Sequence, residues 1–305
     1  MKICWGLIIK SLKTTKIFLF IIPIFLISCE KKIDFQPNEQ EPKLVVEATI
    51  ENGQPPVVTL MKSIGYFSEI STEILVNSFV HNAAVFVSDG IRTHQLKEYN
   101  VPIGNGLFLS YYSIDTSNLA TAIYGQLKQQ YSLRIVVEGK EYTAKTTIPD
   151  ITKKIDSLWW KPSPGNPDTT EVLMIAKITD PPGYGDYIRY YTRINSQPAY
   201  LPPDFATYDD LFIDGSTYEV VVQPGIDRNS DSTESDFFHR GDTVNFKISN
   251  IDKASFDFWR TWESSYSSIG NPFSTPTKVL GNISNNALGY FAGYASQFRT
   301  IIIPK

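Results

Sequence analysis

The sequence predicts a mostly β fold built from two consecutive sandwich-like domains, the second of which carries one amphipathic helix. Three observations support this prediction. Short apolar segments alternate with polar residues at a period of two, turn signals rich in glycine, proline and aspartate separate them, and one segment alone shows a clear helical period. Short strands with regular turn signals are typical of antiparallel β-sandwiches.

The first predicted domain spans residues 43–149, and we expect an immunoglobulin-like or transthyretin-like β-sandwich. Its size of about 100 residues suits such a domain. In residues 131–138, Leu133, Ile135 and Val137 occupy alternate positions and would share one face of a strand. Further strands are expected at residues 44–50, 57–60, 84–88 and 142–146.

The second predicted domain, residues 150–305, is also rich in β-strands. Strands are expected at residues 172–178, 187–194, 218–222 and 242–249. The one good helix is expected near residues 252–267, with Asp252 as its N-cap. On this helix Phe256, Trp259, Tyr266 and either Trp262 or Glu263 recur at helical spacing. We therefore expect an aromatic side that packs on the sheet.

The N-terminal 28 residues have the features of a lipoprotein signal peptide. Lysines precede an apolar stretch, residues 17–27, which is short for a bilayer span of roughly 20 residues. Leu26, Ile27 and Ser28 then lead into Cys29, as in a bacterial lipobox. Cleavage before Cys29 would leave this cysteine to be acylated; the alternative is an uncleaved anchor. The polar, proline-bearing residues 29–42 would form a lipidated tether.

Composition limits the chemistry of the mature chain. Of the two cysteines, Cys4 would leave with the signal and Cys29 would carry lipid, which excludes disulfides, zinc–thiolate sites and cysteine nucleophiles. The net charge of −4 becomes more negative once the lysines of the signal are removed. Without a cluster of basic residues, nucleic acid is not an expected partner.

The sequence contains no recognised catalytic motif, and we expect no cofactor, no metal ion and no enzymatic activity. His81, His94 and His239 have no metal-ligand partner at a known spacing and are interpreted as surface or hydrogen-bonded histidines. A pair of carboxylates for glycoside hydrolysis stays open, because sequence does not show separation in space. The catalytic set is therefore predicted to be empty, and Cys29 is the one predicted site residue.

Two further segments have alternative interpretations. Residues 227–232 begin like a calcium loop, with oxygen ligands at alternate positions, but Ser232 stands where glycine is needed. A solvated acidic loop is preferred there, and whether the Asp227–Asp231 loop binds an ion stays open. Trp159 and Trp160 would point to opposite faces of a strand. Core or interdomain packing is expected for them, with a ligand or partner surface as the alternative.

The C-terminal region carries a distinctive series of short blocks. Asn271-Pro272-Phe273 is followed by Val279-Leu280-Gly281-Asn282 and then by Gly289-Tyr290-Phe291-Ala292-Gly293-Tyr294, with Arg240-Gly241-Asp242 upstream. With Cys29 and Pro42-Lys43-Leu44-Val45-Val46-Glu47 near the N-terminus, this series resembles domain-of-unknown-function family 4249, lipoproteins of the Bacteroidota cell envelope. From the residues alone, the block is interpreted as structural, because its glycines would permit tight turns or close backbone approach. A loop that serves as a binding edge is the alternative.

The resemblance implies an outer-membrane lipoprotein, anchored through lipid on Cys29, on a face of the membrane that stays open. It also implies a TonB-dependent outer-membrane transporter as partner, and no catalytic residues. The leading hypothesis is a non-enzymatic accessory of such a transporter in nutrient capture or transporter assembly. The alternatives are an autonomous surface module that binds glycan or peptide through exposed aromatic residues, and an unrecognised hydrolase with converging carboxylates. The ligand is not predicted.

Overall fold

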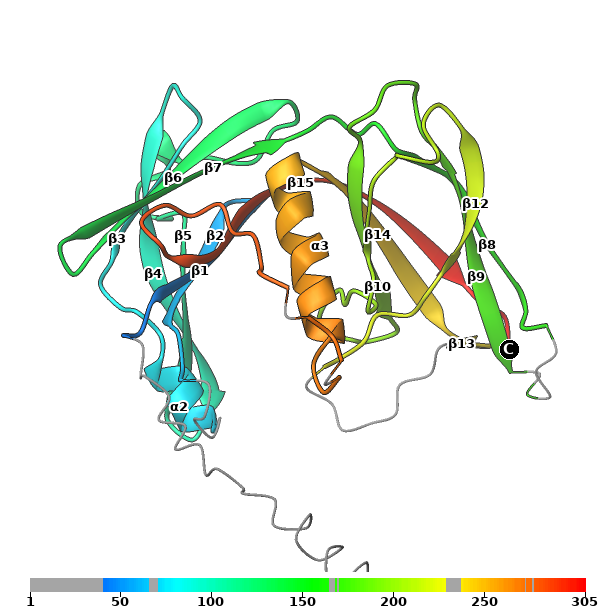
Figure 1. The fold of residues 1–305 in the computed structure, drawn as a ribbon, viewed down its shortest axis with the longest axis horizontal. Helices are drawn as coiled ribbons and strands as arrows, with labels where there is room; N and C mark the ends of the chain where they lie inside the picture. The colour runs from blue at the N-terminus through cyan, green and yellow to red at the C-terminus, as the bar shows by residue number, and fades with distance from the viewer. Residues whose placement is uncertain are drawn as a thin grey trace, which may run out of the picture. The chain divides into compact units, whose positions relative to one another are not determined.

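The computed structural model describes residues 41–65, 71–164, 168, 170–228, 237–271, 273–275 and 277–305. These residues belong to one compact unit that begins at Glu41. The described part is mostly β, so the predicted class, a β-rich fold with sandwich-type packing, is confirmed (Figure 1).

Among the described residues before position 150, the elements are seven strands and two short helical segments. They are β1 Leu44–Glu51, β2 Val57–Lys62, α2 Thr72–Asn77, β3 Ala84–Ser88, β4 Thr93–Gly104, β5 Leu107–Ser113, the 3₁₀ turn η2 Leu119–Thr121, β6 Gln129–Val137 and β7 Lys140–Ile148. Five of these strands were predicted within a few residues of their ends. β4 and β5 were not predicted, and neither was α2, which has no buried residue.

After residue 150, the described part of the chain forms eight strands and one long helix. They are β8 Lys154–Pro162, β9 Glu171–Thr179, β10 Tyr187–Ile194, β11 Thr207–Tyr208, β12 Thr217–Val222, β13 Phe238–His239, β14 Thr243–Ile251, α3 Lys253–Ser267 and β15 Leu288–Ile302. Asp252 is the N-cap of α3, as predicted, and its carboxylate accepts a hydrogen bond of 2.9 Å from the Ser255 amide. The other oxygen of Asp252 accepts from Thr147, which ties the start of α3 to β7.

Two sheets are formed by the described strands. The larger has eleven strands in the order β11-β10-β14-β15-β1-β2-β5-β4-β3-β6-β7, and the smaller consists of β12, β9 and β13 with β8 paired to β9. Most neighbours are antiparallel, as predicted, but β1 and β15 are parallel, with Val46 opposite Gly289. Strand β15 also pairs with β14, so one sheet continues across residue 150 (Figure 1).

The alternative of a C-terminal loop that serves as a binding edge is wrong for residues 288–294, because these residues form the first half of β15. Gly289 has φ +97°, and a Cβ atom there would lie less than 3.0 Å from the Val46 carbonyl oxygen of β1. At Gly293 a Cβ atom would lie 2.7 Å from the Thr147 carbonyl oxygen of β7. The predicted close backbone approach is therefore confirmed, and its purpose is strand pairing.

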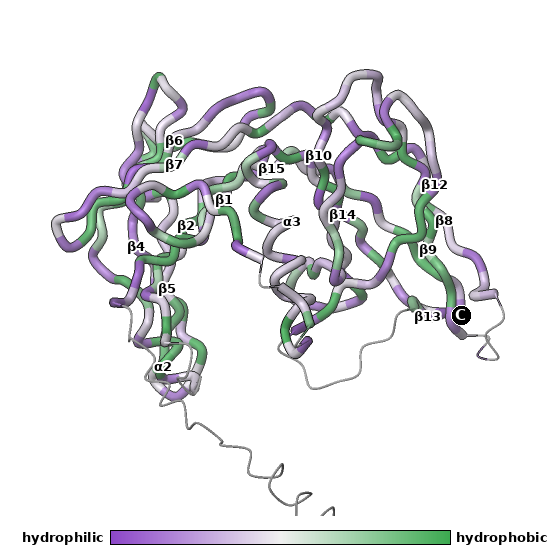
Figure 2. Tube along the Cα trace, in the orientation of Figure 1, coloured by the Kyte–Doolittle hydropathy of each residue, from purple (hydrophilic) through white to green (hydrophobic). Residues whose placement is uncertain are grey.

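Three clusters of buried apolar residues lie around these sheets. The first is enclosed by the strands before residue 150 together with Phe291 and Ala295 of β15. The second lies between the smaller sheet and β10 and β14, and the hydrophobic colour along β9 in Figure 2 marks it. The third lies where Phe258 of α3 packs on Tyr290 and Tyr294 of β15. Alternate residues of β15 thus enter different clusters, as the period of a strand requires.

Candidate functional site: an aromatic and arginine-rich face beside α3

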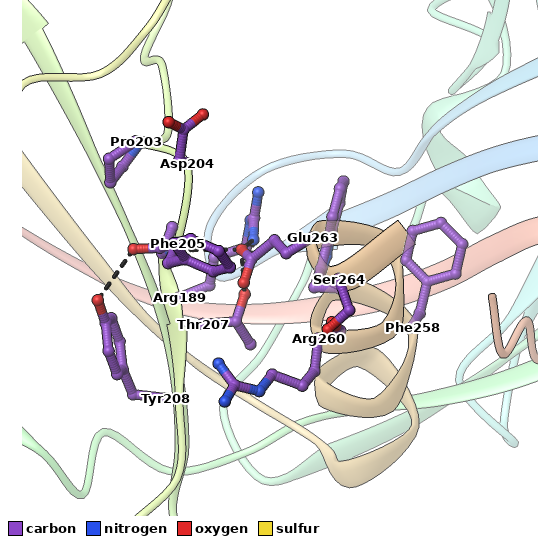
Figure 3. Close-up of polar contacts among 12 residues, drawn as sticks. Arg189, Pro203, Asp204, Phe205, Thr207, Tyr208, Phe258, Arg260, Glu263 and Ser264 are labelled. Carbon is purple, nitrogen blue, oxygen red and sulfur yellow. Dashed lines mark hydrogen bonds and ion pairs between the residues drawn. The ribbon is translucent and has the colours of Figure 1, made fainter. Parts of the chain in front are cut away.

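A buried ion pair joins α3 to the sheet. Arg189 of β10 and Glu263 of α3 are each 1 % exposed, and one guanidinium nitrogen donates to one carboxylate oxygen. The same carboxylate oxygen accepts a hydrogen bond of 2.8 Å from the Thr207 hydroxyl and one of 3.1 Å from the Ala206 amide. Glu263 therefore fixes α3, β10 and the segment before β11 against one another (Figure 3).

Arg189 is also held by an aromatic ring. Its guanidinium lies 4.0 Å from the ring centroid of Trp259, and Trp259 donates a hydrogen bond of 2.8 Å to the Tyr294 hydroxyl. A cation over an indole face is attracted by the ring quadrupole. The predicted packing of the aromatic side of α3 on the sheet is thus observed for Trp259, and also for Phe256, which stacks on Tyr187.

Next to this pair, side chains of three segments, residues 205–208, residue 228 and α3, form an exposed surface that we call the α3 aromatic face. Its residues are Phe205, Tyr208, Arg228, Trp262 and Tyr266. Phe205, Tyr208 and Tyr266 are 44 %, 42 % and 41 % exposed. The prediction that Tyr266 packs on the sheet is therefore wrong; Tyr266 lies in the last turn of α3, which ends at Ser267, and the buried aromatic residue of the helix is Phe258.

The α3 aromatic face is held rigid by contacts among its own side chains. Trp262 and Tyr266 stack at 5.2 Å, and the Arg228 guanidinium lies 5.5 Å and 5.1 Å from their ring centroids. Arg228 also donates to the Asp204 carboxylate over 3.3 Å, and the Tyr208 hydroxyl donates to the Phe205 carbonyl over 2.9 Å (Figure 3). Exposed aromatic and arginine side chains that are ordered before binding are the typical centre of a protein interface.

A second concave region lies over β6 and β7. It is a shallow groove of about 710 Å³, closed on one side by residues 281–284. Arg134 and Lys145 line it together with Asn282, whose amide group binds the Lys145 and Phe291 carbonyls. The groove is open and carries positive charge, so it suits a polar or anionic ligand better than an apolar one.

His94 is a buried, hydrogen-bonded histidine, as predicted. Its Nε2 accepts a hydrogen bond of 3.0 Å from the Asp115 amide, which places the ring proton on Nδ1, 2.8 Å from the Thr121 hydroxyl. Burial lowers the pKa of His94, against a smaller opposing effect of the Asp115 charge. Protonation of Nε2 would also remove the acceptor for the Asp115 amide.

We therefore expect the protein to lose stability as the pH falls below 6.5, the ordinary pKa of histidine. A folded-state pKa below the unfolded value means that the unfolded chain binds the proton more readily, so stability is fully present above pH 6.5 and is lost as the pH falls towards the folded pKa. Urea unfolding at a series of pH values between 7.5 and 5 measures this slope. The His94→Gln variant should show a flatter slope, and an unchanged slope would contradict the assignment to His94.

His81 lies beside an acid and a serine, an arrangement that calls for comparison with a hydrolase triad. Its Nδ1 is 2.6 Å from Glu98 and 3.4 Å from the Ser110 hydroxyl. Both neighbours thus meet the same ring nitrogen, whereas a triad needs the acid on one nitrogen and the nucleophile on the other. Ser110 is also buried and donates to Asn100. This group therefore has the geometry of a hydrogen-bonded cluster that joins His81 to β4 and β5.

The remaining predicted sites are placed as follows. Cys29, the signal residues 1–28 and the tether up to residue 40 lie outside the described residues, as does most of the Asp227–Asp231 loop. Trp160 packs against the second apolar cluster with Arg240 4.9 Å from its ring, in line with core packing. His239 belongs to β13, where its amide donates to Asp242. Trp159 is half-buried on β8.

One group of acidic side chains in the described residues has the spacing of metal ligands. Ligand oxygens of Asp180, Asp210 and Asp214 all lie within 4.8 Å of one another. This group was not predicted from the sequence, where residues 227–232 were the candidate instead. Strands β10 and β11 lie between Asp180 and the other two aspartates along the chain, so no local spacing connects the three. Two sequence features could have pointed to this group. The loop at residues 180–186 is rich in proline and glycine and follows one predicted strand, and the Asp214-Gly215 turn precedes another.

One family model covers most of the chain. The family described as Domain of unknown function (DUF4249) matches residues 30–300. The chain belongs to this family. The match runs from the predicted tether to β15, and it confirms the resemblance that the C-terminal blocks indicated. A comparison of this DUF4249 chain with curated proteins gives no match. No helix within the described residues combines the length and hydropathy that crossing a membrane requires.

Proposed function

We propose that this DUF4249 protein is a lipid-anchored, non-enzymatic lipoprotein of the outer membrane that acts as an accessory of a TonB-dependent transporter. The observation that carries the proposal is the α3 aromatic face. It gathers three exposed aromatic side chains and an arginine over a buried ion pair, and such side chains contribute most of the energy of protein interfaces. The lipobox at Cys29 supports attachment to the membrane.

The accessory role is tested by purification from native membranes. The full chain is extracted in mild detergent, and co-purifying proteins are identified and quantified; the intact mass of the same sample reports acylation of Cys29. We expect a stoichiometric β-barrel transporter. The Phe205→Ala variant should lower the amount of the partner about tenfold, as expected for an interface residue that contributes 1–2 kcal/mol.

The matched control is Phe108→Ala on the β4–β5 hairpin. Phe108 is 46 % exposed and Phe205 is 44 % exposed, so the two variants remove the same side chain at the same exposure. Partner recovery with Phe108→Ala should equal that of the wild type. Equal recovery with Phe205→Ala would overturn the assignment of the partner surface, and a solitary wild-type protein would overturn the accessory role.

The second candidate function is autonomous binding of a glycan or peptide. The groove of about 710 Å³ favours it, because Arg134, Lys145 and Asn282 present polar groups that fit hydroxyl or carboxylate groups of such a ligand. Titration of the purified protein with a glycan and peptide panel, in the absence of any barrel protein, tests this function. Binding that the Arg134→Ala variant loses would support it, and no binding across the panel would remove it.

A further inference from the structure

Three carboxylates converge at one end of the smaller sheet, and none of them belongs to the α3 aromatic face. Asp180 directly follows β9, and Asp210 and Asp214 lie in the loop that leads into β12. Because β9 and β12 pair, with Thr179 opposite Thr217, the two loops leave the sheet side by side. The Asp180 amide donates to the Ser216 carbonyl over 2.9 Å, which joins the loops at their bases.

The two loops are folded around these carboxylates. The Gly183 amide donates to Asp214 over 2.6 Å, and the Gly185 amide donates to Asp210 over 2.8 Å. Gly183 and Gly185 have φ values of +126° and +115°, which side chains other than glycine rarely adopt. The sequence of the loop thus turns its amides inward and holds one oxygen of Asp210 and one of Asp214 in fixed positions.

Asp180 is the unusual member of the group. It is 1 % exposed, yet neither of its carboxylate oxygens has a hydrogen-bond partner among the described residues. Its ion-pair partner is Lys153, also fully buried, whose Nζ lies 3.5 Å from one oxygen and itself makes no hydrogen bond in the described part of the chain. Leaving a buried carboxylate without hydrogen bonds is costly, so this carboxylate indicates a further ligand.

Charge points in the same direction. One lysine ammonium against the three carboxylates leaves two negative charges in a buried setting, and Asp186 is close enough to add to the potential at Asp180. A divalent cation would balance the two charges that Lys153 leaves.

We propose that Asp180, Asp210 and Asp214 bind a calcium ion. Calcium takes oxygen ligands at 2.3–2.6 Å, so two oxygens that share one ion lie up to about 5 Å apart, whereas magnesium limits them to about 4 Å. The three ligand oxygens lie within 4.8 Å of one another, inside the limit that calcium sets. The half-buried Asp214 provides the side from which the ion enters. The bound ion joins two loops that carry the exposed rings of Tyr184 and Phe212.

The test uses the full chain in detergent, treated with a chelator and then titrated with calcium by calorimetry, with thermal unfolding as a second readout. We expect one calcium ion per chain and a higher unfolding midpoint. The Asp214→Asn variant should weaken calcium binding about 10- to 100-fold, because it removes a charged ligand. Its amide oxygen still accepts the hydrogen bond from Gly183, so this variant is expected to fold.

The matched control is Asp209→Asn, which changes a carboxylate of the same loop outside the group and should keep wild-type calcium affinity. Calcium at about 10 mM saturates even weak protein sites. No heat and no shift of the unfolding midpoint at that concentration would overturn the proposal. Equal affinity of Asp214→Asn and wild type would overturn the assignment to these residues, and an equal response to magnesium would overturn the choice of calcium.

Discussion

Replacing Gly289 with alanine is expected to lower the free energy of unfolding by about 2–5 kcal/mol. The new Cβ would lie less than 3.0 Å from the backbone of Val46, so β1 and β15 must separate for it to fit. Strand β15 pairs on its other side with β14, and the strain therefore falls at the centre of the eleven-stranded sheet. Urea unfolding followed by circular dichroism measures the change.

The matched control for this variant is Gly104→Ala. Gly104 has φ +100°, close to the +97° of Gly289, but no atom lies within 4 Å of its prospective Cβ. It therefore carries the conformational cost of a side chain at positive φ, about 1–2 kcal/mol, without the clash. If both variants lost the same stability, the close approach of β1 and β15 would not be the cause.

Removing the charge of Glu263 is expected to cost about 3–5 kcal/mol of stability, because it leaves the buried Arg189 guanidinium without its counterion. The Glu263→Gln variant changes the shape of the side chain least. It keeps one oxygen as acceptor for the Ala206 amide, but it loses the negative charge of the carboxylate to which Arg189 and Thr207 donate. Urea unfolding again measures the loss, and partner recovery with this variant reports whether the α3 aromatic face depends on the pair beneath it.

A double variant, Arg189→Met with Glu263→Leu, separates the charge from the packing. Replacing both members of a buried pair with apolar side chains is often neutral or stabilising. We expect the double variant to be more stable than Glu263→Gln. A double variant that is less stable than the single one would mean that the pair contributes through its hydrogen bonds to Thr207 and Ala206 rather than through charge balance.

Local patterns predicted strands such as β1 and β6, where apolar and polar residues alternate along the segment, and the helix whose N-cap is Asp252. They failed for β15, where Gly289 and Gly293 are signs of turns in isolation. These glycines are needed because Val46 and Thr147 come close, and both neighbours lie more than 140 positions away in the sequence. A property that depends on such distant partners leaves no local trace.

The candidate sites show the same division. The aromatic residues of α3 could be predicted from their spacing, but Phe205 and Tyr208 come from a segment without a period, and only the fold brings them beside the helix (Figure 3). Arg228 likewise reaches Trp262 and Tyr266 only through the fold. Likewise, Asp180 and Asp214 become neighbours through the pairing of β9 with β12. The prediction of a hydrogen-bonded histidine is confirmed for His94, which is buried and uses both ring nitrogens in hydrogen bonds.

The parallel pairing of β1 with β15 has a consequence for the order in which the molecule can assemble. The two partners come from opposite ends of the chain, and β14 lacks one neighbour until residue 288 and those after it exist. A growing polypeptide therefore cannot complete this sheet before β15 has been made, and chains that stop before β15 leave one edge of β1 and one edge of β14 unpaired. Such long-range closure slows folding, which keeps the newly made chain open for longer.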